Sequence, residues 1–146
     1  MPCTDDVAVA LSWAHAADPR AAAVGYRARA EGGMKRVVVE SPYGAATAAE
    51  IERNVRYARA CLTDCLRRGE APLASHLLYT QPGVLNDAVS DERERGMRAG
   101  FAWTEVAELI AVYTDLGVSR GMWDGIGVGT KHRVAVEYRT LADFVA

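Results

Sequence analysis

Long apolar runs and an excess of basic residues are both missing from this 146-residue sequence. No apolar run approaches the roughly 20 residues that cross a bilayer, so we expect no membrane partner. The formal net charge is -2, whereas a nucleic-acid-binding domain usually carries a basic patch, so we expect no nucleic-acid partner. Asp5 and Asp6 stand where a signal peptide would have basic residues, which predicts a cytoplasmic protein.

Cysteine is also scarce, with three in the whole chain. Cys61 and Cys65 lie four residues apart on one face of a predicted helix, a spacing that suits two metal ligands. No second pair of cysteines or histidines completes a zinc site, so we interpret both as buried thiols in a reducing compartment. We expect no metal and no cofactor.

The common phosphate-binding signatures are missing too. The P-loop pattern, GxxxxGK followed by Ser or Thr, does not occur. The glycine-rich GIGVG at 125–129 superficially resembles a dinucleotide-binding turn. It does not follow a strand and open a helix, as that motif requires, so we discard it.

Composition divides the chain at about residue 33. Residues 1–33 are rich in alanine and end in two glycines, whereas 34–146 has the pattern of an α/β domain. Two interpretations of the first segment stay open: an N-terminal extension, helical or disordered, or the product of a translation start placed upstream of Met34. In both cases we expect low order there and no chemistry.

Strands and helices alternate along the rest of the chain. The stretch 35–41 has the continuous apolar run of a strand that is covered on both faces. Thr47 and Glu50 form a capping box that opens a helix ending before Gly69. The remaining elements are predicted as strands at 71–75, 108–114 and 133–139 and as helices at 90–107 and 119–130. This order predicts an α/β fold: a Rossmann-like (flavodoxin-like) three-layer sandwich with a mostly parallel sheet of four or five strands.

The first predicted binding segment follows the first strand, because ligands of open parallel sheets bind beyond the carboxyl ends of the strands. It reads Ser41-Pro42-Tyr43-Gly44. Pro42 fixes one backbone dihedral, Gly44 allows a ligand to approach closely, and Tyr43 offers a ring for a base or ribose. The alternative is an ordinary strand-to-helix turn with Tyr43 packed locally.

The second predicted binding segment is Ser119-Arg120-Gly121-Met122, where the last helix begins. Backbone amides at the start of a helix attract anions, and Arg120 adds a positive charge, so the segment suits a phosphate or a carboxylate. The alternative is a helix that is capped by Ser119 and needs no ligand.

Three further side chains fall at or near the same edge of the sheet. His76 follows the second strand and suits a general base, a ligand contact or a hydrogen-bonded structural role. Asp115 ends the third strand, where a solvated loop acid is the alternative. Asn54 has poor helix propensity, so we expect it to bond a loop at this edge. Trp103 and Trp123 are expected in the core.

A resemblance to a group of bacterial and phage proteins with the nucleoside 2-deoxyribosyltransferase-like fold is carried by ESPYG, ERNVRYARACLTDCL, GEAPLASHLLYTQPGVLND, GMRAGFAW, DLGVSRGM and VEYRTL. This resemblance covers about residues 34–141. The resemblance to the deoxyribosyltransferases themselves is more remote and rests on short motifs. The resemblance implies a Rossmann-like fold and a pocket for a nucleoside or nucleotide. It also implies a homo-oligomer, because the related transferases complete their sites across subunits.

The resemblance also bears on the reaction. In those transferases a Glu nucleophile follows the Gly-Met of the last-helix motif and attacks the anomeric carbon. Here Gly-Met is followed by Trp123, and the next residue, Asp124, points elsewhere on a helix. The resemblance therefore implies ligand binding, with N-glycosidic cleavage or transfer if Asp115 or Asp124 supplies the carboxylate beside His76. A non-catalytic binder or sequestering protein for a nucleotide signal, or a structural protein that retains the fold, stays open.

Overall fold

The structure is a computed structural model, and it describes residues 33–145 of the chain. The alanine-rich extension predicted at 1–33 therefore lies outside the described residues, apart from Gly33. Within 33–145, no helix has both the length and the apolar character to cross a membrane.

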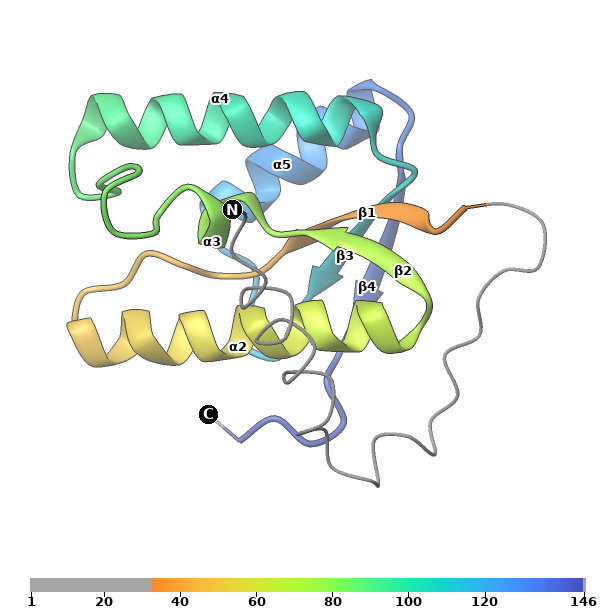
Figure 1. The fold of residues 1–146 in the computed structure, drawn as a ribbon, viewed down its shortest axis with the longest axis horizontal. Helices are drawn as coiled ribbons and strands as arrows, with labels where there is room; N and C mark the ends of the chain where they lie inside the picture. The colour runs from red at the N-terminus through yellow and green to blue at the C-terminus, as the bar shows by residue number, and fades with distance from the viewer. Residues whose placement is uncertain (1–32, 146) are drawn as a thin grey trace, which may run out of the picture.

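Four strands form one sheet, in which every neighbouring pair is parallel (Figure 1). The strands are β1 (Lys35–Glu40), β2 (Glu70–Leu73), β3 (Leu109–Tyr113) and β4 (Ala135–Arg139), in the order β2-β1-β3-β4. The helices are α2 (Ala48–Arg67), α3 (Ser75–Leu78), α4 (Ser90–Val106) and α5 (Arg120–Lys131). The predicted Rossmann-like α/β fold is confirmed, with a sheet of four strands in the described part of the chain.

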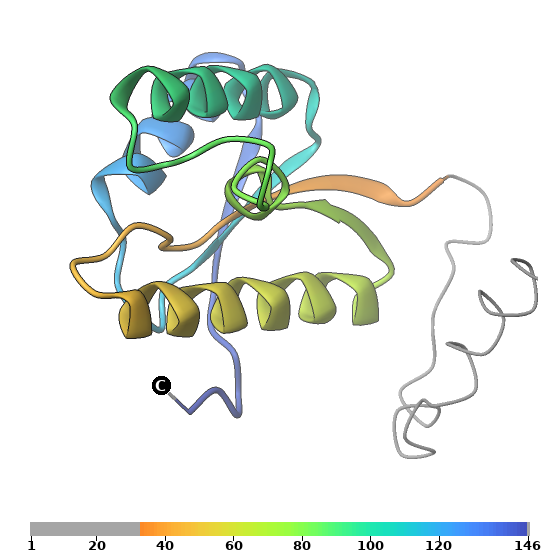
Figure 2. The ribbon, with the colours of Figure 1, turned by 60° about the vertical axis from the view of Figure 1, so that its left-hand side comes forward.

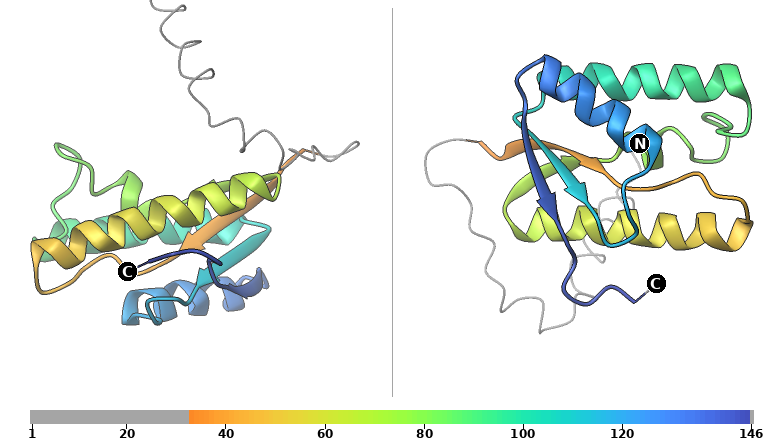
Figure 3. Two further views of the ribbon diagram at one scale, coloured as in Figure 1. Left: turned by 90° about the horizontal axis from the view of Figure 1, so that it is seen from below. Right: turned by 180° about the vertical axis from the view of Figure 1, so that it is seen from behind.

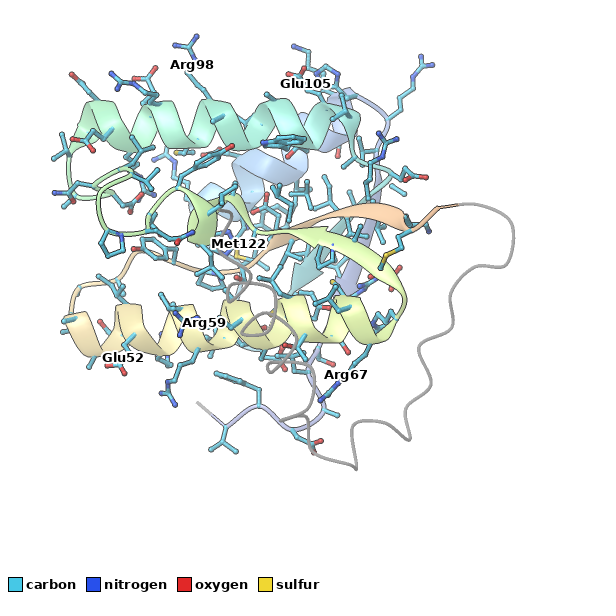
Figure 4. All side chains as sticks on the ribbon, viewed as in Figure 1. Glu52, Arg59, Arg67, Arg98, Glu105 and Met122 are labelled. Atoms are coloured by element: carbon cyan, nitrogen blue, oxygen red, sulfur yellow. The ribbon has the colours of Figure 1, made fainter. Side chains whose placement is uncertain are left out.

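The helices lie in two layers on opposite faces of the sheet. Helix α2 covers one face, whereas α4 and α5 cover the other and contact each other (Figures 1 and 3). Val37 and Tyr57 belong to the apolar cluster beneath α2, and Ile110 and Met122 belong to the cluster beneath α5. On the outer side, Arg98 of α4 points away from the sheet into solvent (Figure 4). The core is thus split into two halves by the sheet.

Two predicted strand boundaries are wrong. Strand β2 ends at Leu73, and the following residues form the short helix α3, which is seen end-on in Figure 2. His76 is therefore part of a helix. The last strand begins at Ala135 and not at residue 133, because Arg133 has a φ of 59°, which an extended strand excludes.

The two tryptophans that were expected in the core are half-exposed instead. Trp103 is 48% exposed and Trp123 is 53% exposed. The buried positions of the same two helices include small residues: Gly100 and Thr104 on α4, and Gly125 and Gly129 on α5. The two tryptophans lie outside these buried positions of α4 and α5.

Local sequence sets both ends of α2 and the start of α5. The Thr47 hydroxyl accepts a hydrogen bond from the Glu50 amide at 3.2 Å, and the Glu50 carboxylate accepts one from the Thr47 amide at 3.0 Å, which is the predicted capping box. Helix α2 ends before Gly69, whose φ of 75° favours glycine. At the start of α5 the Ser119 hydroxyl accepts a hydrogen bond from the Met122 amide at 3.4 Å.

The two cysteines within the described residues are buried thiols, as predicted. Cys61 and Cys65 are both 0% exposed, and neither forms a disulfide. Burial raises the pKa of the Cys65 thiol to about 11, so this group stays protonated near neutral pH. Cys3 lies outside the described residues.

A buried ion pair joins the two edge strands. Arg139, the last residue of β4, donates two hydrogen bonds of 2.8 Å to the carboxylate of Glu70, the first residue of β2. The Arg139 side chain also donates to Sγ of Cys65 on α2. Beside this pair, the Tyr113 hydroxyl of β3 donates to Asp64 of α2 at 2.7 Å. The network therefore ties both edges of the sheet to the α2 layer.

Glu70→Gln is expected to destabilise the protein by about 3–5 kcal/mol, because it leaves the Arg139 guanidinium buried without its main counter-charge. Urea unfolding followed by circular dichroism would measure the change. Glu137→Gln is the matched control, because Glu137 also contacts Arg139 at 3.0 Å but its side chain is 49% exposed. Its expected cost is within about 1 kcal/mol. Equal losses in the two variants would contradict the structural role of the Glu70 pair.

Candidate functional site

The candidate site lies where the chain connections diverge from the middle of the sheet. Strand β1 leads to β2 on one side, whereas β3 lies on the other side of β1 and leads to β4. Such an arrangement opens a crevice beyond the carboxyl ends of the two central strands. A cavity of about 290 Å³ occupies this position. Its walls come from the loop after β1, from α3 and α4, and from the first turn of α5.

Both predicted binding segments line this cavity. We call residues 41–44 the β1 loop and residues 119–122 the α5 start. Ser41, Tyr43 and Gly44 of the β1 loop contribute to the wall, and all four residues of the α5 start do so. In Figure 4, Met122 lies between α5 and the end of the sheet. Pro42 is buried behind the loop and does not line the cavity.

Asn54 holds the β1 loop in place from α2. Its side-chain amide donates a 2.8 Å hydrogen bond to the carbonyl oxygen of Tyr43, and its own oxygen accepts two hydrogen bonds from Arg53. Asn54 is only 2% exposed, so it acts on the site through the backbone of Tyr43 and does not line the cavity. This bond between α2 and the β1 loop explains why an asparagine, which has poor helix propensity, occupies a position inside α2.

His76 lies in the cavity wall and is paired with the β1 loop. Its Nε2 atom is 2.8 Å from the hydroxyl oxygen of Ser41. Its ring also meets the Tyr43 ring edge-on, with the two centroids 6.5 Å apart. Burial lowers the pKa of His76 to about 4, so the imidazole is neutral at physiological pH. A neutral ring that shares a hydrogen bond with a buried hydroxyl positions the loop and presents a polar edge to the cavity.

Glu40, the last residue of β1, is a carboxyl group in the cavity that sequence reasoning did not identify. Burial raises the pKa of Glu40 to about 8. Within residues 33–145 its carboxyl group has no hydrogen-bond or ion-pair partner. One signal in the sequence pointed to it: Glu40 ends a run of three valines at the carboxyl edge, where ligands of parallel sheets bind.

Gly125 of α5 makes the space for the Glu40 side chain. A Cβ atom at position 125 would overlap Oε1 of Glu40. Gly129, one turn further along, allows the same close approach over Ile110. A glycine inside a helix costs about 1 kcal/mol relative to alanine. These glycines of the GIGVG stretch thus serve helix-to-sheet packing inside α5, and no dinucleotide-binding turn is formed.

The two aspartates proposed as the carboxylate lie away from the cavity. Asp115 accepts a 2.6 Å hydrogen bond from the Tyr57 hydroxyl and another from the Leu141 amide, which ties the C-terminal segment to α2. Asp124 is exposed on α5, next to the half-exposed Trp123. The structure therefore brings His76, the β1 loop and the α5 start together, but neither aspartate joins them.

Positive charge reaches the cavity from two elements. Arg120 belongs to the α5 start, and Arg93 of α4 lines the same cavity near Gly44, where it pairs with Asp87 at 2.6 Å. A wider groove of about 850 Å³ continues from the cavity past Tyr43 and Arg93, along the loop at 80–88. Within the described residues, no cluster of three or more His, Cys, Asp or Glu side chains is placed to hold a metal ion.

Comparison with protein families adds one result. Residues 35–139, from β1 to the end of β4, match the model of a family described as a domain of unknown function (DUF7768). The chain belongs to the DUF7768 family. Among curated proteins, none matches the chain. The match gives the extent of the domain but no function, and the cavity is the feature of the structure that bears on function.

Glu40→Gln is expected to remove a pH-dependent loss of stability from this DUF7768 domain. In the unfolded chain Glu40 ionises near the ordinary glutamate pKa of 4.5, whereas the folded protein keeps the proton up to a pKa of about 8. Between these values the folded state binds more protons than the unfolded state. The free energy of unfolding therefore falls as the pH rises, by at most about 1.4 kcal/mol per pH unit from this group.

Thermal unfolding across this range measures the effect. We expect the Tm of Glu40→Gln to exceed that of the wild type by a margin that grows from about pH 5 to about pH 8 and then levels off. Glu52→Gln removes a carboxylate from the exposed face of α2 and is the control for surface charge. A margin that stays constant with pH would show that Glu40 is not held protonated by the fold.

Proposed function

We propose that the cavity binds a nucleoside or nucleotide derivative. The observation that carries this proposal is the meeting of the β1 loop and the α5 start at one cavity, which Tyr43 and Arg120 both line. An aromatic ring suits a base or a ribose, and a cation at a helix start suits a phosphate. A ligand that combines these groups is a nucleotide.

The phosphate would lie at the α5 start. Within the described residues, the first-turn amides of Arg120 and Gly121 donate no hydrogen bond in the protein, whereas those of Met122 and Trp123 are taken by Ser119. Free amides at the N-terminus of a 12-residue helix, together with the Arg120 side chain, favour an anion. Gly121 has open space around its Cα, so a ligand can approach the backbone there.

The base would lie toward Tyr43 and the wider groove. Tyr43 borders both the cavity and the groove, and Phe101 adds a second ring to the cavity wall. Polar side chains, among them Ser41 and His76, line the same cavity and could bond the ribose hydroxyls or the edge of the base. The resemblance to the nucleoside 2-deoxyribosyltransferase-like fold supports the same ligand class.

Cleavage or transfer of an N-glycosidic bond is the second candidate function. One observation favours it: the cavity contains a carboxyl group, Glu40, although the position expected for the nucleophile is occupied by the exposed Trp123. Asp115 and Asp124, proposed from the sequence for the carboxylate, are less suited because they lie outside the cavity. A binder without turnover keeps the ligand intact, which chromatography of the incubated ligand distinguishes.

Isothermal titration of the protein with nucleosides and with the corresponding nucleoside 5′-monophosphates tests the binding proposal. We expect at least one monophosphate to bind, and to bind more tightly than its nucleoside. Arg120→Ala should weaken the monophosphate about 10- to 100-fold, because a charge-assisted hydrogen bond is lost, and should leave the nucleoside affinity nearly unchanged.

Arg98→Ala is the matched control, because Arg98 is exposed on α4 and points away from the sheet (Figure 4). Its affinity for the same monophosphate should equal that of the wild type. No binding by any nucleoside or monophosphate would refute the proposal. If Arg98→Ala and Arg120→Ala lose affinity for the monophosphate equally, the phosphate does not bind at the α5 start.

A further inference from the structure

Glu40 is a group that the fold alone does not explain. Glu40 is half-buried at the edge of the cavity, and partial desolvation of a carboxyl group without a hydrogen-bond partner lowers stability. Arg139 and Glu70 show that this chain pairs buried charges on the α2 face of the sheet. On the other face Glu40 has no such partner among residues 33–145, yet α5 gives up a side chain at Gly125 to make room for it.

Building on the proposed nucleotide site, we propose that Glu40 is the general acid that protonates the departing base of a nucleotide whose N-glycosidic bond is cleaved. This assigns a catalytic residue at the end of β1, a position different from that of the nucleophile in the resembling transferases. It also assigns a different role, since an acid donates a proton and makes no covalent bond to the sugar.

The position of Glu40 fits this role. Its carboxyl group contacts α5 at Gly125, and the residue directly precedes the β1 loop, so it lies between the two segments proposed to bind the ligand. A nucleotide with its phosphate at the α5 start and its base near Tyr43 spans this part of the cavity. The bond between sugar and base then falls near the carboxyl group of Glu40.

The protonation state fits as well. Desolvation keeps the pKa of Glu40 near 8, so at neutral pH the group carries the proton that an acid must donate. The other charged or titratable groups of the cavity are the neutral His76 on α3, the Tyr43 hydroxyl, the paired Asp87 and Arg93, and Arg120 on α5. Burial alone accounts for the raised pKa of Glu40, and none of these groups contributes to it.

The proposed step is a hydrolysis. The bond between C1′ and the base nitrogen breaks, and its electron pair stays on the nitrogen, which takes the Glu40 proton. A water oxygen forms a bond to C1′ and releases a proton, which restores the acid form of Glu40 through solvent. The products are the free base and a sugar phosphate with a hydroxyl group on C1′, and nothing is oxidised or reduced.

A matched pair of substrates isolates the proton transfer. Purine nucleoside 5′-monophosphates need a proton on the departing base, whereas their N7-methyl derivatives already carry a positive charge and leave without one. With Glu40→Gln, release of the purine base should fall by about 100-fold or more. Release of the N7-methyl base should fall by less than about tenfold. For the wild type, kcat/KM should decline above about pH 8 for the first substrate and not for the second.

Each other result counts against the acid role. Equal losses on both substrates would make Glu40 a positioning group, and unchanged purine release in Glu40→Gln would exclude it from the reaction. A wild-type protein that binds monophosphates in the titration but releases no base from either substrate would overturn this inference and leave the binding proposal standing. Failure of all monophosphates to bind would overturn both.

A pair of glycine variants tests the geometry independently. Gly125→Ala forces the Glu40 carboxyl group to move, so purine release should fall as it does in Glu40→Gln, with the N7-methyl substrate again spared. Gly127→Ala is the control, because a Cβ atom there meets nothing within 4 Å. Its turnover should match the wild type, and circular dichroism would show that both variants are folded. Wild-type purine release in Gly125→Ala would contradict the assigned position.

Discussion

The close approach of α5 to the sheet is the constraint on which the candidate site depends. Gly129 lets the helix lie against Ile110, and Gly125 lets it lie against Glu40. The same approach places the first turn of α5 near the end of β1, where both line the cavity, and it partly desolvates Glu40, which raises the pKa of that group. The weak helix propensity of glycine is the cost of this arrangement. The same packing therefore shapes the cavity and raises the pKa of Glu40.

The two faces of the sheet treat buried polar groups in opposite ways. Beneath α2, Arg139 and Glu70 satisfy each other, as do Tyr113 and Asp64, so the charges there hold the layers together. On the α4 and α5 side, Glu40 has no partner among the described residues, and burial disfavours its ionised form. The polar network that joins the layers lies on one face, and a carboxyl group with a strongly shifted pKa, a feature common at functional sites, lies on the other.

The sequence contained enough information for the architecture and for the position of the β1 loop and the α5 start at one edge of the sheet. Alternating strands and helices predicted the parallel sheet, and the rule for carboxyl ends then placed Tyr43 and Arg120 at one edge. Glu40 escaped notice because its burial depends on Gly125, which is remote in the chain. Asp115 was misplaced for the same reason, since its partners Tyr57 and Leu141 are distant in sequence. Helix α3 has only four residues, too few to show a helical period, so His76 was expected in a loop.

The bond between Asp115 and the Leu141 amide has a practical consequence for handling the protein. Phe144 packs edge-on against Tyr57, so the segment 141–144 follows α2, on the face of the sheet opposite α5 (Figure 1). A protein shortened to end before Leu141 would lose this bond and uncover the Tyr57 ring, which is 0% exposed in the intact fold. Expression of the domain should therefore keep the segment 141–144.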